Sequence, residues 1–263
     1  MKKILLVGKN SFIASYFLAK LSDHFIVDCI SHVNINDVKY DDYDLVINCS
    51  INPEYRNQSY SLNNDVDLKL SRKFTGHYIM LSSRKVYGTS DELLSYTEQS
   101  NTNPNDHYGH NKLTTELAIS SERDNYTILR ASNVYGLEYG RNSFMGFLMN
   151  QLKDKQYITI DISPYTARDL ISVQDIANIV KLTVDTPIRG VYNLSSGEAE
   201  LVGKLAQYLI SGYGKGELVS KSKQLKDQFI ISNDKLLNAL GIQQYNFNNQ
   251  NNIELLGKQL CKI

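Results

Sequence analysis

Short apolar runs alternate with stretches of helical periodicity through the first half of this chain. Residues 3–7, 25–30 and 44–48 are apolar with few interruptions, as strands buried on both faces of a sheet are. Residues 12–21 carry apolar side chains three and four positions apart, as an amphipathic helix does. Strands that alternate with helices predict a parallel sheet covered on both faces. We therefore expect an α/β protein with a doubly wound parallel sheet.

The pattern continues less regularly towards the C-terminus. Residues 243–252 are polar and low in complexity, which predicts a mobile or surface loop. The remaining strands are expected at residues 77–81, 126–129, 158–162 and 191–194, and the remaining helices at 62–73, 107–121, 144–152, 173–184, 201–211 and 233–240.

Composition excludes several classes of function. The 263 residues include 28 Lys and Arg and 28 Asp and Glu, so the net charge is 0 and offers no basic surface for nucleic acid. No apolar run approaches the length of a membrane span. Cys29, Cys49 and Cys261 form no C-x-x-C pair, which predicts free thiols in a reducing, cytoplasmic compartment.

The segment from Gly8 to Ala14 joins the first strand to the first helix with the spacing G-x-x-S-x-x-A. A parallel α/β sheet binds the pyrophosphate of a dinucleotide at this position, on the N-terminus of the helix. Any strand–glycine–helix turn has a similar pattern, so the loop alone leaves cofactor binding open. The candidate cofactor contacts here are Gly8, Asn10, Ser11, Phe12 and Ile13.

The end of the second strand bears on the choice of cofactor. An acidic residue there would favour a free ribose 2′-hydroxyl, but Asp28 comes too early and the strand is followed by Ser31 and His32. These side chains can donate hydrogen bonds to a 2′-phosphate, so we expect NADP(H) in preference to NAD(H). Cys49 and Ser50, after the third strand, are the other expected cofactor contacts.

Tyr108 and Lys112 form a Y-x-x-x-K motif. On a helix the two side chains share a face, and the ammonium group favours the phenolate form of the tyrosine. Tyr16 and Lys20 have the same spacing, but Tyr108 also follows Ser83, which ends a predicted sheet strand. Ligands of parallel sheets gather at such strand ends. Ser83, Tyr108 and Lys112 are therefore the candidate catalytic residues.

The order of these motifs resembles the extended short-chain dehydrogenase/reductase family, in the branch that acts on nucleotide-linked sugars. The resemblance implies a Rossmann-type sheet with a smaller C-terminal substrate-binding region. Residues 1–135 and 169–195 would form the dinucleotide-binding domain, and residues 136–168 and 196–263 the substrate-binding region. The matching segments are the Gly8 loop, LSSRKVYG at 81–88, YGHNK at 108–112, LRASNVYG at 129–136, RDLISVQD at 168–175 and VYNLSSG at 191–197.

The resemblance implies a role for each matching residue. Ser83 would hydrogen-bond the reacting oxygen, Tyr108 would be its general acid and base, and Lys112 would bind the nicotinamide ribose. Tyr108 and Lys112 would thus both contact the cofactor. Arg168 would hold the diphosphate of a sugar nucleotide, because an arginine fork matches phosphate geometry; the alternatives are an ion pair with Asp169 and a place on a solvated face. The implied substrate contacts are Ser83, Arg84, Asn133 and Arg168.

One departure from the family narrows the expected reaction. Related sugar-nucleotide dehydratases carry an Asp-Glu pair after the serine, where this chain has Arg84 and Lys85. We therefore expect reduction of a nucleotide-linked 4-keto-6-deoxy sugar for cell-surface polysaccharide biosynthesis. An NAD-dependent nucleotide-sugar epimerase is the alternative. A cofactor-binding regulatory relative without catalysis is a further alternative, although it would not need Ser83, Tyr108 and Lys112.

Other partners are few. His107 and His110 lack a third metal ligand, so no metal site is expected. The expected partner is the nucleotide-sugar substrate, with neither nucleic acid nor membrane, and a homodimer is left open.

Overall fold

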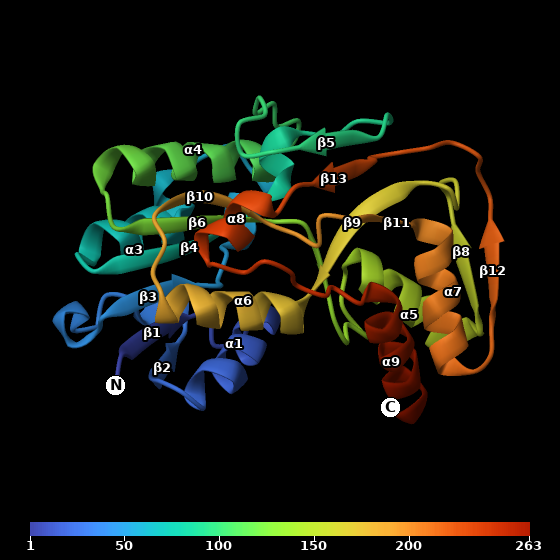
Figure 1. Ribbon diagram of the computed structural model, residues 1–263, viewed down its shortest axis with the longest axis horizontal. Helices are drawn as coiled ribbons and strands as arrows, with labels where there is room; N and C mark the ends of the chain where they lie inside the picture. The colour runs from blue at the N-terminus through green and yellow to red at the C-terminus, as the bar shows by residue number, and fades with distance from the viewer.

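A parallel sheet of six strands forms the first part of the molecule in the computed structural model, which describes residues 1–263 (Figure 1). The strand order is β10-β6-β4-β3-β1-β2, and each neighbouring pair is parallel. Ile4 faces one hydrophobic core and Leu5 faces the other, which explains the uninterrupted apolar runs. The predicted α/β fold is confirmed. The strands are β1 (Lys3–Val7), β2 (Ile26–Ile30), β3 (Leu45–Asn48), β4 (His77–Ser83), β6 (Tyr126–Ala131) and β10 (Gly190–Leu194).

Helices cover both faces of this sheet. α1 (Phe12–Ser22) and α6 (Val173–Asp185) pack on one face, and α3 (Val66–Lys73) and α4 (His107–Glu122) pack on the other. The helix predicted over 62–73 is divided at Asp65, whose side chain accepts a hydrogen bond from Leu68 N and caps α3. The short elements are α2 (Pro53–Asn57), η1 (His32–Asn34), η2 (Tyr40–Asp42), η3 (Leu62–Asn64) and η4 (Arg84–Tyr87).

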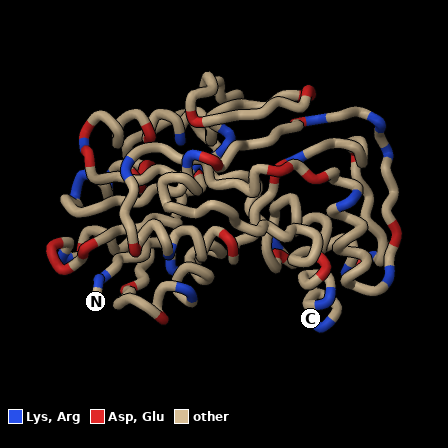
Figure 2. Tube along the Cα trace, in the orientation of Figure 1, with Lys and Arg blue, Asp and Glu red and all other residues tan.

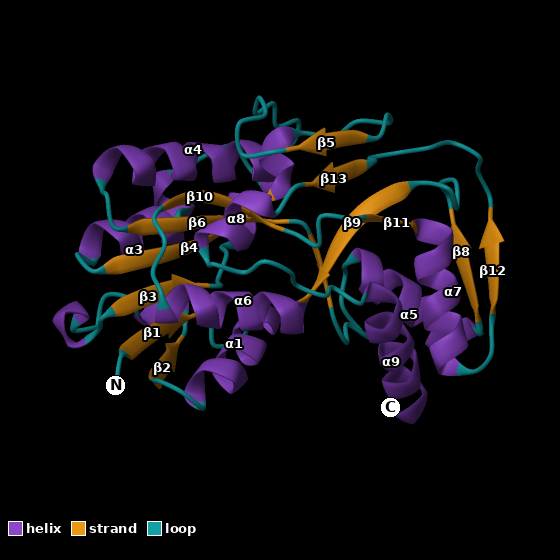
Figure 3. Ribbon diagram, viewed as in Figure 1, coloured by secondary structure: helices purple, strands orange, loops and turns teal.

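A second part, with its own hydrophobic core, lies beside the first (Figure 3). Three of its helices pack around that core, and its strands are short. Strands β11, β9, β13 and β5 form one sheet in that order, β7 pairs with β9, and β8 pairs with β12. The elements are β5 (Leu94–Tyr96), β7 (Asn133–Tyr135), α5 (Phe144–Lys155), β8 (Tyr157–Ile160), β9 (Ala167–Ser172), β11 (Ala199–Leu201), α7 (Val202–Tyr213), β12 (Glu217–Ser220), β13 (Phe229–Ile231) and α9 (Asn249–Lys262). The remaining helix, α8 (Asp234–Ala239), packs on the core of the first part through Leu236.

The buried carboxylate of Asp169, on β9, connects distant segments of the chain. It accepts hydrogen bonds from the backbone N–H and hydroxyl groups of Ser196, at 3.1 and 2.9 Å, and from the N–H groups of Gly197 and Ile231, at 3.2 and 3.1 Å. The Ser132 hydroxyl, after β6, lies 3.2 Å from the same group. One side chain therefore ties the end of β6, the end of β10 and β13 together.

The C-terminal tail corrects one prediction. Residues 243–252 were expected to form a loop, but α9 begins at Asn249. The side chain of Asn248 accepts a hydrogen bond from Asn251 N and caps the helix. Ile253 and Leu260 are then buried against the second core. The asparagine-rich stretch starts a helix because its apolar face is covered by the rest of the protein.

Charges of both signs are spread over both parts of the chain, with no region of one sign (Figure 2). None of the helices has the length and apolar character needed to cross a membrane. The structure contains no group of three His, Cys, Asp or Glu side chains that could hold a metal ion.

Candidate active site

A cavity of about 730 Å³ opens where the strands of the six-stranded sheet end. Its sheet side consists of residues that end or follow β3, β4 and β6, together with the first turn of α1. Its other side includes the loop that leads into α5 and one residue of α2. The main lining residues are Ser11, Phe12, Ile13, Asn48–Ile51, Arg56, Leu81–Ser83, Tyr108, Lys112, Ala131–Val134, Glu138 and Gly140–Phe144.

Gly8 makes the turn between β1 and α1 possible. Its φ is +125°, and a Cβ atom would lie 3.0 Å from the Cys49 carbonyl carbon and from Ser50 N, so a side chain is excluded both by conformation and by space. Gly8 and Asn10 form the turn without lining the cavity, whereas Ser11, Phe12 and Ile13 line it. The turn thus brings the N-terminus of α1 to the cavity, where free backbone N–H groups favour a phosphate.

Ser31 and His32 follow β2, beside the glycine turn. The N–H groups of Gly8 and Lys9 donate hydrogen bonds to the carbonyl of Ile30, at 2.8 and 3.0 Å. Neither Ser31 nor His32 lines the cavity, and both are partly exposed. The residues at and directly after the end of β2, Ile30 to His32, include no carboxylate.

Ser83, Tyr108 and Lys112 all line the cavity. Ser83 ends β4, and Tyr108 lies in the first turn of α4, which Asp106 caps by accepting a hydrogen bond from Gly109 N at 2.7 Å. A Cβ atom on Gly109 would lie 2.5 Å from the Lys85 carbonyl oxygen. The glycine therefore lets α4 approach the turn that directly follows Ser83, and this brings the serine and the tyrosine to one cavity.

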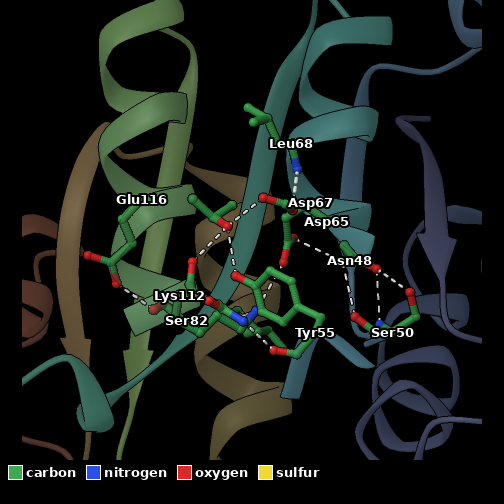
Figure 4. Close-up of polar contacts among 12 residues, drawn as sticks. Asn48, Ser50, Tyr55, Asp65, Asp67, Leu68, Ser82, Lys112 and Glu116 are labelled. Carbon is green, nitrogen blue, oxygen red and sulfur yellow. Dashed lines mark hydrogen bonds and ion pairs between the residues drawn. The ribbon is translucent and has the colours of Figure 1, made fainter. Parts of the chain in front are cut away.

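Two acceptors beneath the cavity hold the side chain of Lys112. Its side chain is 4% exposed, and its Nζ donates to Asp67 Oδ2 at 2.9 Å and to the Leu81 carbonyl at 2.8 Å (Figure 4). Burial lowers the pKa of Lys112, but the Asp67 carboxylate, together with Tyr55 and Tyr108, outweighs burial, and the net shift is upward. The lysine is therefore charged at any ordinary pH.

The second Y-x-x-x-K motif lies elsewhere. Tyr16 is half-buried on α1 with its ring edge-on to Phe12, and it does not line the cavity. Burial raises the pKa of its hydroxyl. The Y-x-x-x-K motif of Tyr16 and Lys20 therefore lies outside the cavity, and Tyr16 packs within α1.

Of the expected substrate contacts, Asn133 lines the cavity but Arg84 and Arg168 do not. Arg84 is buried, pairs with both carboxylate oxygens of Asp227 at 2.8 and 2.5 Å, and stacks on Phe229. Arg168 donates to the carbonyl oxygens of Asp227 and Lys226, each at 3.2 Å. Both arginines therefore hold the segment before β13, and Arg168 forms no ion pair with Asp169.

Two arginines that the sequence analysis missed do line the cavity. The guanidinium of Arg56 lies over the Tyr108 ring, 5.2 Å from its centroid, and that of Arg141 lies over the Phe12 ring at 4.9 Å. Arg141 is half-exposed and 3.8 Å from the Glu138 carboxylate. Arg141 lies five positions after the end of the motif at 129–136, which was a usable signal, whereas nothing in the sequence marks Arg56.

A parallel sheet with a glycine turn, a helix N-terminus and a Ser, Tyr and Lys set at one cavity defines a nicotinamide-dinucleotide enzyme fold. The model of the NAD dependent epimerase/dehydratase family matches residues 4–195, and the chain belongs to this family. The cavity fits that cofactor: its volume, the excluded side chain at Gly8 and the end of α1 suit a dinucleotide pyrophosphate.

Known proteins resemble this chain to different extents. A dTDP-4-dehydrorhamnose reductase of Sinorhizobium fredii is 35% identical over 125 residues, which are 46% of this chain and 42% of that protein. The match therefore spans under half of the relative's length.

Solved structures share the fold over nearly the whole chain. A UDP-N-acetylglucosamine 4-epimerase from Methanobrevibacter ruminantium in complex with UDP-N-acetylmuramic acid is 18% identical, with a TM-score of 0.81 over 99% of this chain and 98% of its own. RMD from Pseudomonas aeruginosa, complexed with NADPH, is 18% identical, with a TM-score of 0.80 over 100% and 99%. At these identities the likeness describes the fold.

Proposed function

We propose that this chain is an NADP(H)-dependent oxidoreductase that reduces the keto group of a nucleotide-linked 4-keto-6-deoxy sugar. One observation carries the proposal: the side chains of Ser83, Tyr108 and Lys112 line a single cavity at the strand ends of the sheet. A partial relative that is named as a reductase of a nucleotide-linked keto sugar supports the same reaction.

The three side chains divide the chemistry at the reacting oxygen. The Ser83 hydroxyl donates a hydrogen bond to the carbonyl oxygen, and the Tyr108 hydroxyl delivers the proton as that oxygen becomes an alcohol. The Lys112 ammonium stabilises the negative charge left on the tyrosine. The nicotinamide group, when bound, supplies the hydride.

The net charge of the chain is 0, so the chain as a whole does not attract a negatively charged diphosphate. The substrate diphosphate therefore needs positively charged side chains at the cavity itself. Arg56 and Arg141 line the cavity with partly free guanidinium groups, and Asn133 offers an amide beside them. We assign the phosphates to these arginines. Arg168 would act indirectly, because its guanidinium lies over the ring of Phe144, which lines the cavity, at 5.3 Å.

Elimination of water is disfavoured because it needs an acid and a base near the sugar. Lys85, after Ser83, pairs with Asp106 at 3.5 Å, and Glu138 is the one carboxyl among the lining residues. Burial raises the pKa of Glu138. No second carboxyl lines the cavity, so the acid–base pair that elimination needs is incomplete.

The preference for NADPH rests on the end of β2. Asp28, the nearest carboxylate in the sequence, accepts a hydrogen bond from the Tyr43 hydroxyl at 2.8 Å and lies 3.4 Å from Lys3. Ser31 and His32 are free to meet a 2′-phosphate. We expect NADPH to bind more tightly than NADH, and His32→Ala to reduce the difference; tighter binding of NADH in a fluorescence titration would contradict this preference.

The test of the reaction is a panel of dTDP-, UDP- and GDP-linked 4-keto sugars mixed with the protein and NADPH. Loss of the reduced-nicotinamide absorbance with one of them, absent in Tyr108→Phe, supports the reductase. Isomer exchange without consumption of NADPH identifies an epimerase instead. Binding of NADPH with neither reaction would point to a regulatory relative.

A further inference from the structure

Asp67, on α3, is a buried acidic residue next to the cavity that no motif marks. It is 4% exposed. Oδ2 accepts the hydrogen bond from Lys112, and Oδ1 accepts one from Asn48 Nδ2 at 2.9 Å (Figure 4). Oδ1 also accepts a hydrogen bond from the Tyr78 hydroxyl at 2.7 Å. All of its donors come from other elements, so the carboxylate connects β3, β4 and α4 beneath the cavity floor.

The lysine side of this contact is equally constrained. An ammonium group has three N–H donors, and Asp67 and the Leu81 carbonyl take two of those on Lys112. Lys112 also lines the cavity. With two donors fixed, the direction of the third is fixed as well.

A second carboxylate nearby does a different task. Asp65 accepts hydrogen bonds from Leu68 N at 2.9 Å and from the hydroxyls of Thr115 and Tyr60 at 2.6 and 2.9 Å. All of these donors are neutral, and one of them, Leu68 N, lies in the first turn of α3. Asp65 is thus the helix cap, and Asp67 is the counterion of the lysine.

Asn48 extends the contact to the cavity wall. Its Nδ2 donates to Asp67 and to the Ser50 carbonyl, and its Oδ1 accepts from Ser50 N at 3.0 Å and from the Ser50 hydroxyl at 2.8 Å. Residues 48–51 line the cavity. The same carboxylate therefore sets both the lysine and the loop after β3.

We infer that Asp67 is a positioning residue that holds the Lys112 ammonium charged and aimed into the cavity. The charge on Lys112 follows from the contacts alone, and its action on a bound dinucleotide rests on the proposed function. The titratable groups that face this lysine are Asp67 on α3, Tyr55 on α2, Tyr108 on α4 and Cys49 after β3, with Asp65 and Tyr78 behind them.

The first test needs no ligand. Burial is the largest influence on Lys112, and Asp67→Asn removes the largest one that opposes it. The pKa of Lys112 in the folded variant should therefore fall below the unfolded value of about 10.4. The unfolded chain then binds more protons, and stability rises with pH. Between pH 6.5 and 9.5 we expect the melting temperature of Asp67→Asn to rise, by about 3 °C for each pH unit in which Lys112 is neutral when folded.

The double variant Asp67→Asn/Lys112→Met isolates the lysine, and it should lack this rise. Wild type should also lack it, because its raised pKa keeps Lys112 protonated below about 10.4 in both states. Asp65→Asn is the matched control: it removes an equally buried carboxylate and should lower stability without the rise of melting temperature with pH.

Should Asp67→Asn fail to fold at neutral pH, adding Lys112→Met should restore folding. Parallel pH curves, or a double variant no more stable than Asp67→Asn, overturn the inference.

The second test uses NADPH as the probe. A neutral amine is a weaker donor than an ammonium, so the NADPH dissociation constant of Asp67→Asn should rise about tenfold from pH 6.5 to 9.5 relative to wild type. Equal pH dependence in the two proteins makes Asp67 a structural counterion only and contradicts the positioning role. If wild type binds no NADPH while the melting curves behave as expected, the proposed function fails and the charged pair stands.

Discussion

The two sides of the cavity are built in contrasting ways. On the sheet side, strand ends and α4 present Ser83 and Lys112, and a buried ion pair of 2.9 Å fixes the lysine. On the other side, the loop into α5 presents Arg141, half-exposed and 3.8 Å from its partner Glu138. Buried, fully bonded groups hold one geometry, whereas exposed charges adjust at little cost. The sheet side is suited to fixing the chemistry, and the loop side to selecting the ligand.

The largest effect on activity is expected from a substitution on the sheet side of the cavity. Tyr108→Phe removes the proton donor, and we expect turnover to fall by ~10²–10⁴, the usual contribution of a positioned acid or base. Tyr16→Phe is the matched control, since it has the same motif spacing but lies outside the cavity. Turnover measured with the substrate found in the NADPH panel decides between them. An inactive Tyr16→Phe with an active Tyr108→Phe would mean that the site is misplaced.

The next effect probes the loop side. Arg141→Ala should raise the KM for the nucleotide sugar by about 30-fold with little change in kcat, since a charge-assisted hydrogen bond to phosphate contributes about 2 kcal/mol. Arg168→Ala should instead lower the melting temperature, because its guanidinium holds two carbonyl oxygens before β13. Steady-state kinetics and melting curves on the same preparations separate the two. If Arg168→Ala raised the KM strongly and Arg141→Ala did not, Arg168 and not Arg141 would bind the diphosphate.

Most residues of the sheet side could be brought to one cavity from the sequence because their signals are local. Continuous apolar runs mark strands buried on both faces, and Ser50, Ser83 and Asn133, which line the cavity, end or follow such strands within a few positions. Gly109 was named only as part of the motif, yet its missing side chain lets α4 approach Lys85. That role depends on a tertiary contact and leaves no trace in spacing.

The loop side and the second part were harder to predict because their contacts are distant in sequence. Strand β5 pairs with β13, Leu94 with Phe229, and neither three-residue strand has a readable periodicity. Arg168 was assigned to a phosphate from its motif, but its partners are 58 and 59 positions away. No local pattern reveals such a partner.

A smaller effect concerns the core of the second part alone. Gly212→Ala on α7 should destabilise by about 1–3 kcal/mol, because a Cβ atom there would lie 1.9 Å from the Glu254 carbonyl oxygen of α9. Alanine would otherwise favour a helix. Ser211→Ala, on the exposed face, should change stability by less than about 0.5 kcal/mol. Denaturant curves measure both, and an unaffected Gly212→Ala would mean that the helices pack less closely.

The smallest effect belongs to the six-stranded part. Burial, with help from Arg123, lowers the pKa of His77 to about 4, below the unfolded value of about 6.5. Its contribution to stability is therefore present above pH 6.5 and is lost as the pH falls towards 4. Because the side chain is partly exposed, we expect a loss of about 1 kcal/mol. His77→Gln should flatten the stability curve in this window, and an unchanged slope would contradict the assignment.

The return of α6 and β10 to the first sheet has a consequence for biosynthesis. Ile176 and Val180 of α6 complete the core on the α1 face, and β10 covers the outer edge of β6. A nascent chain that ends near residue 135 thus exposes an apolar sheet face and an open strand edge, both of which favour aggregation. The dinucleotide-binding part cannot finish folding on the ribosome until residues 173–194 have emerged. A fragment that ends near residue 135 should therefore be prone to aggregation, whereas the longer chain covers both the sheet face and the strand edge.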